Sequence, residues 1–461
     1  MTHENRLQTI HDFWVQHNAT LLLILLLLIF SAYSVFLSCN LQREIIPDEP
    51  YRFEISQHFA ATWGIPENVP AAVAFGDNLQ RNAYLGYWIF GRALALYRWV
   101  VPAASGWQQL VALRLLNSAF SLGTAIFTYL IAKQLIRNKW WQLLPVFLLT
   151  NTLMFVFLSG GVSYDNPANL CATVGIYFLL RSLTGKDFLA NSLGWMIAIA
   201  AGTLIKRTIL PLALVMGLVW LIYLLRQRPS LDPKSLKNPK MLPLLVIFTL
   251  LIILNLALYG TNLVQFQSLT PKCSDTYPLE VCRESVFGVR HQQLGLDKKL
   301  TVVDAVRQGY PDPLRYTFEV WLREMTRRIF GIMGHKTYYP VVISYFQIAL
   351  VWMLLLGVRT IEKPDFKLIS LLGIFGFYTL VLLGINYDSE LTYGFIQVAV
   401  QGRYLFPVYA ILVTLYATVL SKVPHPAVRR VTLLATLILF FYGGPIRFVL
   451  YRHSVFADWF I

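Results

Sequence analysis

The hydrophobic pattern of the chain is a series of long apolar runs separated by polar connections. Runs of about 18 to 23 residues are long enough to cross ~30 Å of hydrocarbon as helices. The pattern therefore predicts an all-α polytopic membrane bundle of about eleven transmembrane helices. The predicted spans are 19–38, 110–132, 143–161, 166–181, 190–205, 208–225, 241–260, 341–358, 367–386, 404–421 and 431–450.

Two connections, 39–109 and 261–340, are too long to be simple turns. The stretch "AYLGYWIFGRALALYRWVV" in the first mixes aromatic residues with arginines, as a helix in the membrane interface does. In the second, an amphipathic stretch carries Arg323, Arg327 and Arg328 on its predicted polar side. These arginines either rest on anionic headgroups or belong to a lid over a lipid-facing cavity. We expect one membrane domain, 1–461, with two loops that contain interfacial helices.

The distribution of charge orients the predicted spans. The sequence is 56% hydrophobic and 14% charged, with a formal net charge of +15. Lysines and arginines concentrate in alternate short connections, which is typical of the cytoplasmic side. These connections lie near 133–139, 181–186, 226–240, 359–367 and 422–430. The N-terminus is thus predicted inside and both long loops outside, with the lipid bilayer, and not nucleic acid, as the partner of the basic residues.

Two cysteines in the second long loop, Cys273 and Cys282, have the spacing C-x8-C. A disulfide persists in an exported loop, so we expect these two to be bonded, with Cα atoms within ~7 Å. Two free thiols are the alternative.

Acidic residues occur at two predicted outer positions. Asp48 and Glu49 follow Pro47 in "REIIPDEPYRFE", after the first span. Asp165 and Asn166 follow Tyr164 in "SGGVSYDNPANL". Helix capping would explain each site alone. Two acidic sites on one membrane face also suit the activation of a hydroxyl or the binding of a metal.

Basic residues interrupt apolar sequence on the same predicted face. Lys206 and Arg207 lie in "GTLIKRTILP", and Arg403 lies in "QGRYLFPV" between Gln401 and Tyr404. Snorkelling or pairing with nearby carboxylates would explain them. Charge at the membrane edge more often has a function, and these cations suit a lipid phosphate.

The quoted motifs "PDEPYRFE", "GGVSYDNPANL", "LIKRTILPL" and "QGRYLFPV" resemble those of a bacterial membrane-protein family named domain of unknown function 2142. The order of spans, acidic sites and interfacial helices resembles the GT-C class of polyprenyl-phosphate-sugar-dependent glycosyltransferases. Over nearly the whole chain, the resemblance implies a GT-C-like bundle. It implies that Asp48 is the catalytic base and Glu49 its companion, that Asp165 is the second acidic position, and that Lys206 and Arg403 hold carrier phosphate.

Taken together, the sequence predicts a transferase that moves a sugar from a polyprenyl-phosphate donor to an envelope glycan or lipid-linked acceptor. The reaction is expected on the outer face of the bacterial cytoplasmic membrane. Asp48 is preferred over Glu49 as base because adjacent helical residues point about 100° apart. A transporter or flippase for lipid-linked glycans and a non-catalytic envelope-assembly component are the alternatives. The sequence names no set of metal ligands and leaves a divalent metal open.

Overall fold

The structure is a computed structural model. It describes residues 3–67, 69–185, 187–228, 239, 241–286, 288–289, 300–309, 312–394 and 400–461, without the side chains of 3–17 and 393. The basic connections predicted near 181–186 and 226–240 fall partly outside this description, at 186, 229–238 and 240.

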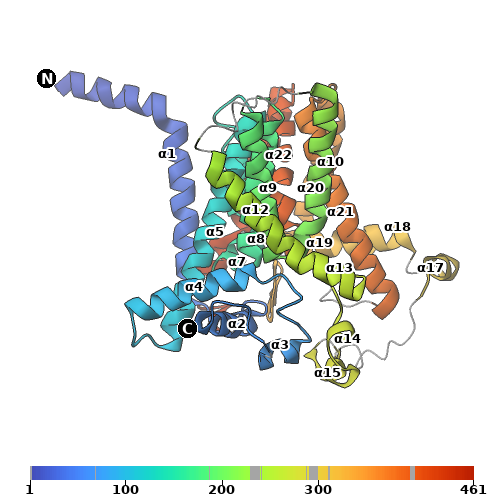
Figure 1. The fold of residues 1–461 in the computed structure, drawn as a ribbon. Helices are drawn as coiled ribbons and strands as arrows, with labels where there is room; N and C mark the ends of the chain where they lie inside the picture. The colour runs from blue at the N-terminus through green and yellow to red at the C-terminus, as the bar shows by residue number, and fades with distance from the viewer. Residues whose placement is uncertain are drawn as a thin grey trace.

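Parallel and antiparallel helices form one bundle, whose long axis is vertical in Figure 1. In the described part of the chain, nine helical segments are long and apolar enough to cross a membrane, and the chain is accordingly a multi-pass membrane protein. The segments comprise α1 (His3–Asn40), α5 (Gly106–Leu135), α9 (Phe188–Ile205), η1 (Arg207–Ile209) with α10 (Leu210–Gln227), α12 (Met241–Asn255) with η2 (Leu256–Gly260) and α13 (Thr261–Phe266), α20 (Ile343–Thr360), α21 (Phe366–Tyr393), η4 (Gly402–Leu405) with α22 (Phe406–Lys422), and α23 (Pro426–Gly443) with α24 (Pro445–Leu450).

The predicted all-α membrane bundle is confirmed, whereas the number eleven is not. The predicted span 143–161 is divided into α6 (Leu144–Thr150) and α7 (Leu153–Ser159), each too short to cross alone. At the division, Asn151 and Thr152 donate side-chain hydrogen bonds back to the carbonyls of the preceding turn. The predicted span 166–181 forms α8 (Asp165–Ser182), whose polar residues keep it outside the nine.

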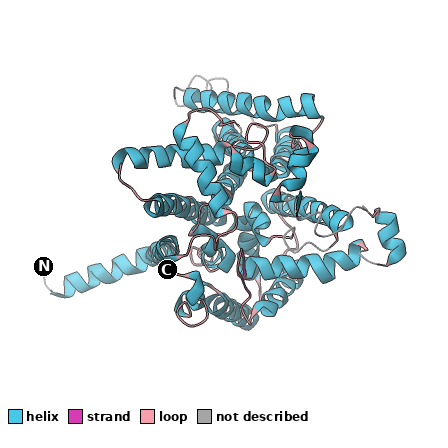
Figure 2. Cartoon of the chain, turned by 90° about the horizontal axis from the view of Figure 1, so that it is seen from below, coloured by secondary structure: helices cyan, strands magenta, loops and turns pink. Residues whose placement is uncertain are grey.

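Both long loops lie at the same end of the bundle, opposite the N-terminus (Figure 1). The first forms α2 (Glu49–Ala61), α3 (Pro70–Phe75) and α4 (Leu85–Val100). The second forms α14 (Cys273–Thr276), α15 (Leu279–Glu284), α17 (Val302–Gln308), α18 (Pro313–Arg315), η3 (Tyr316–Trp321), α19 (Leu322–Phe330) and the hairpin β1 (Ile332–Met333) and β2 (Thr337–Tyr338). The view from below in Figure 2 shows how fully helix dominates this face.

The amphipathic stretch around α19 differs from its prediction. Arg323 and Arg327 are partly exposed, but Arg328 is buried, where it pairs with Glu324 and donates to the carbonyl oxygen of Val400. The three arginines of the predicted polar side therefore do not share one exposed surface. The helix packs against η4, which contains Arg403, and against Val400 just before it.

The last residues of the chain lie beside the start of the first loop. Gln42 N–H donates to the carbonyl of Trp459, and Ile461 N–H donates to that of Asn40. The short helix η5 (Ala457–Trp459) adds Asp458, which pairs with Lys336 of the hairpin. These contacts hold the segment that leads to Asp48.

The predicted disulfide between Cys273 and Cys282 is confirmed, with a Cα–Cα distance of 5.8 Å. It joins α14 to α15 at the outer end of the molecule.

Candidate active site

Asp48 occupies an unusual backbone position at the start of α2. It is the N-cap residue, with φ 58° and ψ 14°, in the left-handed region that side chains other than Asn and Asp rarely adopt. Its side chain makes no capping hydrogen bond. Its N–H donates instead to His335 Nε2, in the hairpin, over 3.4 Å. The capping explanation for Asp48 is therefore not supported by its contacts.

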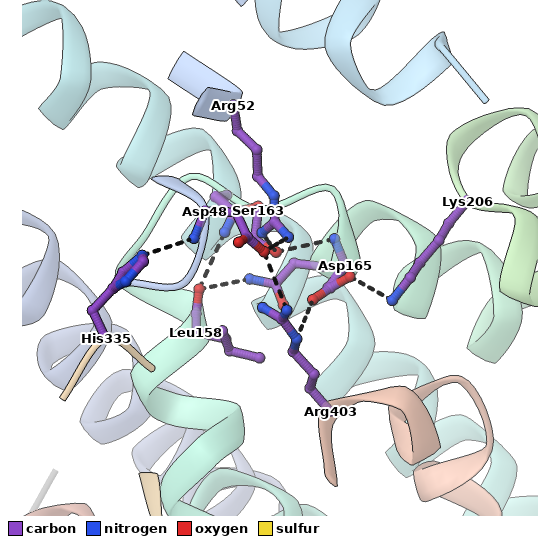
Figure 3. A network of polar contacts seen from close by, with 10 residues as sticks. Asp48, Arg52, Leu158, Ser163, Asp165, Lys206, His335 and Arg403 are labelled. Carbon is purple, nitrogen blue, oxygen red and sulfur yellow. Dashed lines mark hydrogen bonds and ion pairs between the residues drawn. The ribbon is translucent and has the colours of Figure 1, made fainter. Parts of the chain in front are cut away.

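The Asp48 carboxylate lies between two arginines (Figure 3). Its Oδ2 accepts hydrogen bonds from Arg52 Nη2 at 3.1 Å and from Arg403 Nη2 at 3.2 Å. The side chain remains 34% exposed. It is thus both oriented and open to a second molecule.

Glu49 has a different environment from its neighbour. Its side chain is fully buried and accepts from Arg114 Nε at 2.9 Å, Arg114 Nη2 at 2.6 Å and the N–H of Val162 at 2.8 Å. Glu49 is therefore paired with a basic side chain of α5. Glu49 thus connects the first loop to α5 and to the segment before α8. Its carboxylate is not part of the network around Asp48.

Asp165 is brought to Asp48 by a tight connection between α7 and α8. A Cβ on Gly161 would lie 2.5 Å from Ile46, so only glycine permits this approach of the two loops. The buried Asp165 carboxylate accepts from Lys206 Nζ at 2.6 Å and lies 3.7 Å from Arg403 Nε. One guanidinium thus contacts both acidic sites and places Asp48 and Asp165 in one network.

Lys206 and Arg403 reach the site from equivalent local structures. Each lies at a break in apolar sequence, Lys206 just before the 3-10 turn η1 and Arg403 within the 3-10 turn η4. Each turn leads into a long helix with proline in its first turn, α10 or α22. Helix α10 begins at Leu210, shortly after Lys206, and α22 begins at Phe406, shortly after Arg403, and the N-terminus of a helix carries a partial positive charge. This arrangement favours an anion.

Arg52 and Ser163 complete the network, and the motif analysis did not single them out. Arg52 is buried, donates from Nη1 to Ser163 Oγ at 2.7 Å, and lies with its guanidinium carbon 4.3 Å from the centroid of the Tyr164 ring. Its spacing of four residues from Asp48 on a helix start was the available signal.

The remaining predicted residues divide between this network and its surroundings. Tyr404 lies under Lys206, whose Nζ is 4.7 Å from the ring centroid. Asn166 donates to the carbonyl of Leu158 and so shapes the connection before α8. Gln401 is buried, and its carbonyl accepts from Tyr404 N–H at the start of η4. Arg207, in contrast, is exposed outside the network.

The charges around the two carboxyls determine their protonation. Burial raises the pKa of Asp48, but the Arg52 and Arg403 charges outweigh it and lower the pKa below its usual value. For Asp165, burial likewise opposes ionisation, and Lys206 and Arg403 more than offset it, so its pKa is lowered too. Both side chains are carboxylates at neutral pH.

The network has an excess of positive charge. Arg52, Lys206 and Arg403 face the carboxylates of Asp48 and Asp165, which leaves one positive charge unbalanced. Among the described residues, no group of three His, Cys, Asp or Glu side chains is placed to hold a metal. Because each carboxylate already binds cationic side chains, this donor set suits an anionic ligand better than a metal ion.

One family of known proteins matches part of the chain. Residues 84–270 match the family described as dolichyl-phosphate-mannose-protein mannosyltransferase. No curated protein sequence matches the chain.

Solved structures resemble the whole described bundle. The oligosaccharyltransferase of Archaeoglobus fulgidus, tethered to an acceptor peptide, has a TM-score of 0.54 at 12% identity over 94% of this chain and 55% of its own. ArnT of Cupriavidus metallidurans, bound to undecaprenyl phosphate, has a TM-score of 0.47 at 13% identity over 90% of this chain and 62% of its own. The chain thus spans less than two thirds of either protein. The likeness to the oligosaccharyltransferase shows that the fold is that of GT-C glycosyltransferases.

Proposed function

We propose that this protein is a membrane glycosyltransferase that takes a sugar from a polyprenyl-phosphate donor. The acceptor is a hydroxyl of an envelope glycan or of a lipid-linked glycan, on the outer face of a bacterial cytoplasmic membrane. One observation carries the proposal: the partly exposed Asp48 carboxylate and the buried Arg403 guanidinium meet at the loop end of an apolar bundle. The match to a family named for dolichyl-phosphate-mannose supports the donor class.

Asp48 is the proposed general base. It is ionised, oriented by Arg52, and more exposed than Asp165 or Glu49. In the reaction, an acceptor hydroxyl gives its proton to Asp48 while its oxygen attacks the anomeric carbon of the donor sugar. A new glycosidic bond forms as the bond between that carbon and the phosphate oxygen breaks, and the electron pair leaves with the lipid phosphate.

Lys206 and Arg403 are the proposed phosphate ligands, since their excess positive charge would be neutralised by a singly charged phosphodiester. As the lipid phosphate leaves, it gains a further negative charge, and fixed cations that stabilise this charge lower the barrier. Asp165 holds Lys206 and Arg403 and is a positioning residue. Glu49 and Arg114 position the loop without touching substrate. Arg207 could meet only a more distant part of the lipid headgroup.

The experiment that tests the proposal is mass spectrometry of lipid-linked sugars and envelope glycans in cells with and without the gene. If the protein is a transferase, one polyprenyl-phosphate sugar should accumulate when the gene is absent, and one sugar should be missing from a glycan. Re-expression of the wild-type chain should reverse both changes. An unchanged donor pool and unchanged glycans would contradict the proposal, and an accumulated complete lipid-linked glycan would instead indicate the flippase.

A further inference from the structure

Arg403 is an enclosed guanidinium with unequal contacts. Its Nη2 donates to Asp48 Oδ2, whereas its Nε and Nη1 are buried without a hydrogen-bond partner in the described structure. The 3.7 Å from Nε to Asp165 Oδ2 is too long for a hydrogen bond. Because a buried donor without a partner is unfavourable, an anion that reaches Nε and Nη1 satisfies both groups.

Arg52 binds the same carboxylate oxygen but is held more firmly. It also donates to Ser163 Oγ and lies over the Tyr164 ring, and it leaves only Nε without a partner. Of the two arginines on Asp48, Arg403 is therefore the one that an incoming anion can more easily redirect. Arg52 would keep Asp48 in place after the change.

We propose that the donor's phosphate, when it binds Arg403, withdraws the guanidinium from Asp48 and so frees the carboxylate to accept a proton. This inference rests on the proposed function, because it takes the anion to be the phosphate of a polyprenyl-linked sugar. Donor binding would then precede deprotonation of the acceptor. The phosphate would both bind the donor to Arg403 and free Asp48 to act as the base.

The charges around Asp48 agree with this order. Before an anion binds, Arg52 and Arg403 stabilise the ionised carboxylate and make it a weak base. Asp165 acts in the opposite direction, and His335 contacts only the Asp48 N–H. A phosphate on Arg403 offsets one of the two cations, and its own negative charge further favours protonation of Asp48.

Chemical labelling of carboxyl groups can measure the release of Asp48 without any sugar transfer. A hydrophobic carbodiimide reacts with protonated carboxyls, and peptide mass spectrometry reports modification at Asp48. The full chain in lipid nanodiscs would be labelled alone, with farnesyl phosphate, with uncharged farnesol and with inorganic phosphate. Glu54, exposed on the same helix, serves as internal control. Saturable quenching of tryptophan fluorescence would report binding of each probe.

Farnesyl phosphate should speed labelling of Asp48 and leave Glu54 unchanged. A neighbouring charge shifts a carboxyl pKa by roughly 1–3 units, and each unit changes the protonated fraction about tenfold. Farnesol should have no effect. An equal response to inorganic phosphate would assign the release to the phosphate group alone, and a response only to farnesyl phosphate would assign it to the lipid-linked form; both support the inference.

Variants of Arg403 give an independent check. Arg403→Gln should show fast labelling of Asp48 without any ligand and no further response to farnesyl phosphate. Arg403→Lys keeps the charge without the forked geometry and should give an intermediate rate. Saturable binding of farnesyl phosphate with unchanged or slower labelling of Asp48 would overturn the inference and leave the proposed function standing. Absence of saturable binding would contradict both.

Discussion

Glu49 and Arg114 form a fully buried ion pair in which each carboxylate oxygen accepts a hydrogen bond from the guanidinium. Arg114 also donates to the carbonyls of Ser38, Leu41 and Gln42. The pair therefore joins α5, the end of α1 and the first long loop. Asp48, one residue earlier, is partly exposed and belongs to a separate network. The two adjacent acids thus have different environments and, we expect, different roles.

Replacing Glu49 should destabilise the folded protein. Glu49→Gln leaves the Arg114 charge buried without its partner, and breaking such a pair costs about 3–5 kcal/mol. The burial of Glu49 indicates that this variant should reduce the amount of folded protein in the membrane. Thermal unfolding in detergent, followed by size-exclusion chromatography, would measure it.

A double variant separates the charge effect from other damage. Glu49→Leu with Arg114→Met removes both charges, and replacement of a buried pair by apolar residues is often far less costly than removal of one partner. The double variant should be more stable than Glu49→Gln alone. Equal or greater destabilisation would show that the pair's role is not electrostatic compensation.

Substitutions of Lys206 and of the adjacent Arg207 should have different effects on the affinity for farnesyl phosphate. Lys206→Gln removes the cation that lies nearest to Asp165 and a proposed phosphate ligand, so affinity for farnesyl phosphate should fall by about tenfold or more, as for a lost charged hydrogen bond of about 1.5–3 kcal/mol. Arg207→Gln, at an exposed position, should change affinity much less. Tryptophan quenching would compare them at low and high salt. A larger loss from Arg207→Gln would assign the phosphate to the other cation.

The pH dependence of stability follows from the lowered carboxyl pKa values. Asp48 and Asp165 are more acidic in the folded protein than in the unfolded chain. Their contribution is fully present above the unfolded pKa of about 3.9 and is lost as the pH falls through the folded pKa. Thermal stability of the wild type should therefore show no step from these groups between pH 5 and 8. A change in thermal stability between pH 5 and 8 that is present in the wild type and absent in Asp165→Asn would contradict the lowered pKa of Asp165.

Thiol labelling should distinguish the four cysteines. In the native, non-reduced protein, a maleimide should modify the exposed Cys39, whereas Cys273 and Cys282 are bonded and Cys171 is partly buried against the core of the bundle. Reduction should add two modified sites. Mass spectrometry of the peptides would count them, and modification of Cys273 or Cys282 before reduction would be inconsistent with the disulfide.

The sequence predicted those residues of the site that interrupt or border an apolar run. Asp48, Asp165, Lys206 and Arg403 are polar residues at the edges of apolar runs, where charge is costly without a purpose. Arg114 was missed although it lies inside the predicted span 110–132, and an arginine within a span was itself the signal. The break between α6 and α7 was missed because periodicity does not report the side-chain hydrogen bonds of Asn151 and Thr152.

The packing of the second long loop could not be predicted from the sequence, for a different reason. The position of Arg328 depends on contact between α19 and the start of η4, where a Cβ on Gly402 would lie 2.5 Å from the Arg328 backbone. An amphipathic pattern gives the polar side of a helix but not what that side meets. Tertiary contact turned a predicted surface arginine into a buried one.

The central claim, that Asp48 is the general base, is tested most directly by the rate of sugar transfer from a polyprenyl-phosphate donor by Asp48→Asn in proteoliposomes. Glu54→Gln, an exposed change on the same helix, is the matched control, with both proteins at equal amounts. The account predicts that Asp48→Asn inserts normally, still binds farnesyl phosphate, and transfers sugar about 100- to 10,000-fold more slowly, while Glu54→Gln transfers at the wild-type rate. Transfer by Asp48→Asn at the wild-type rate would contradict the account.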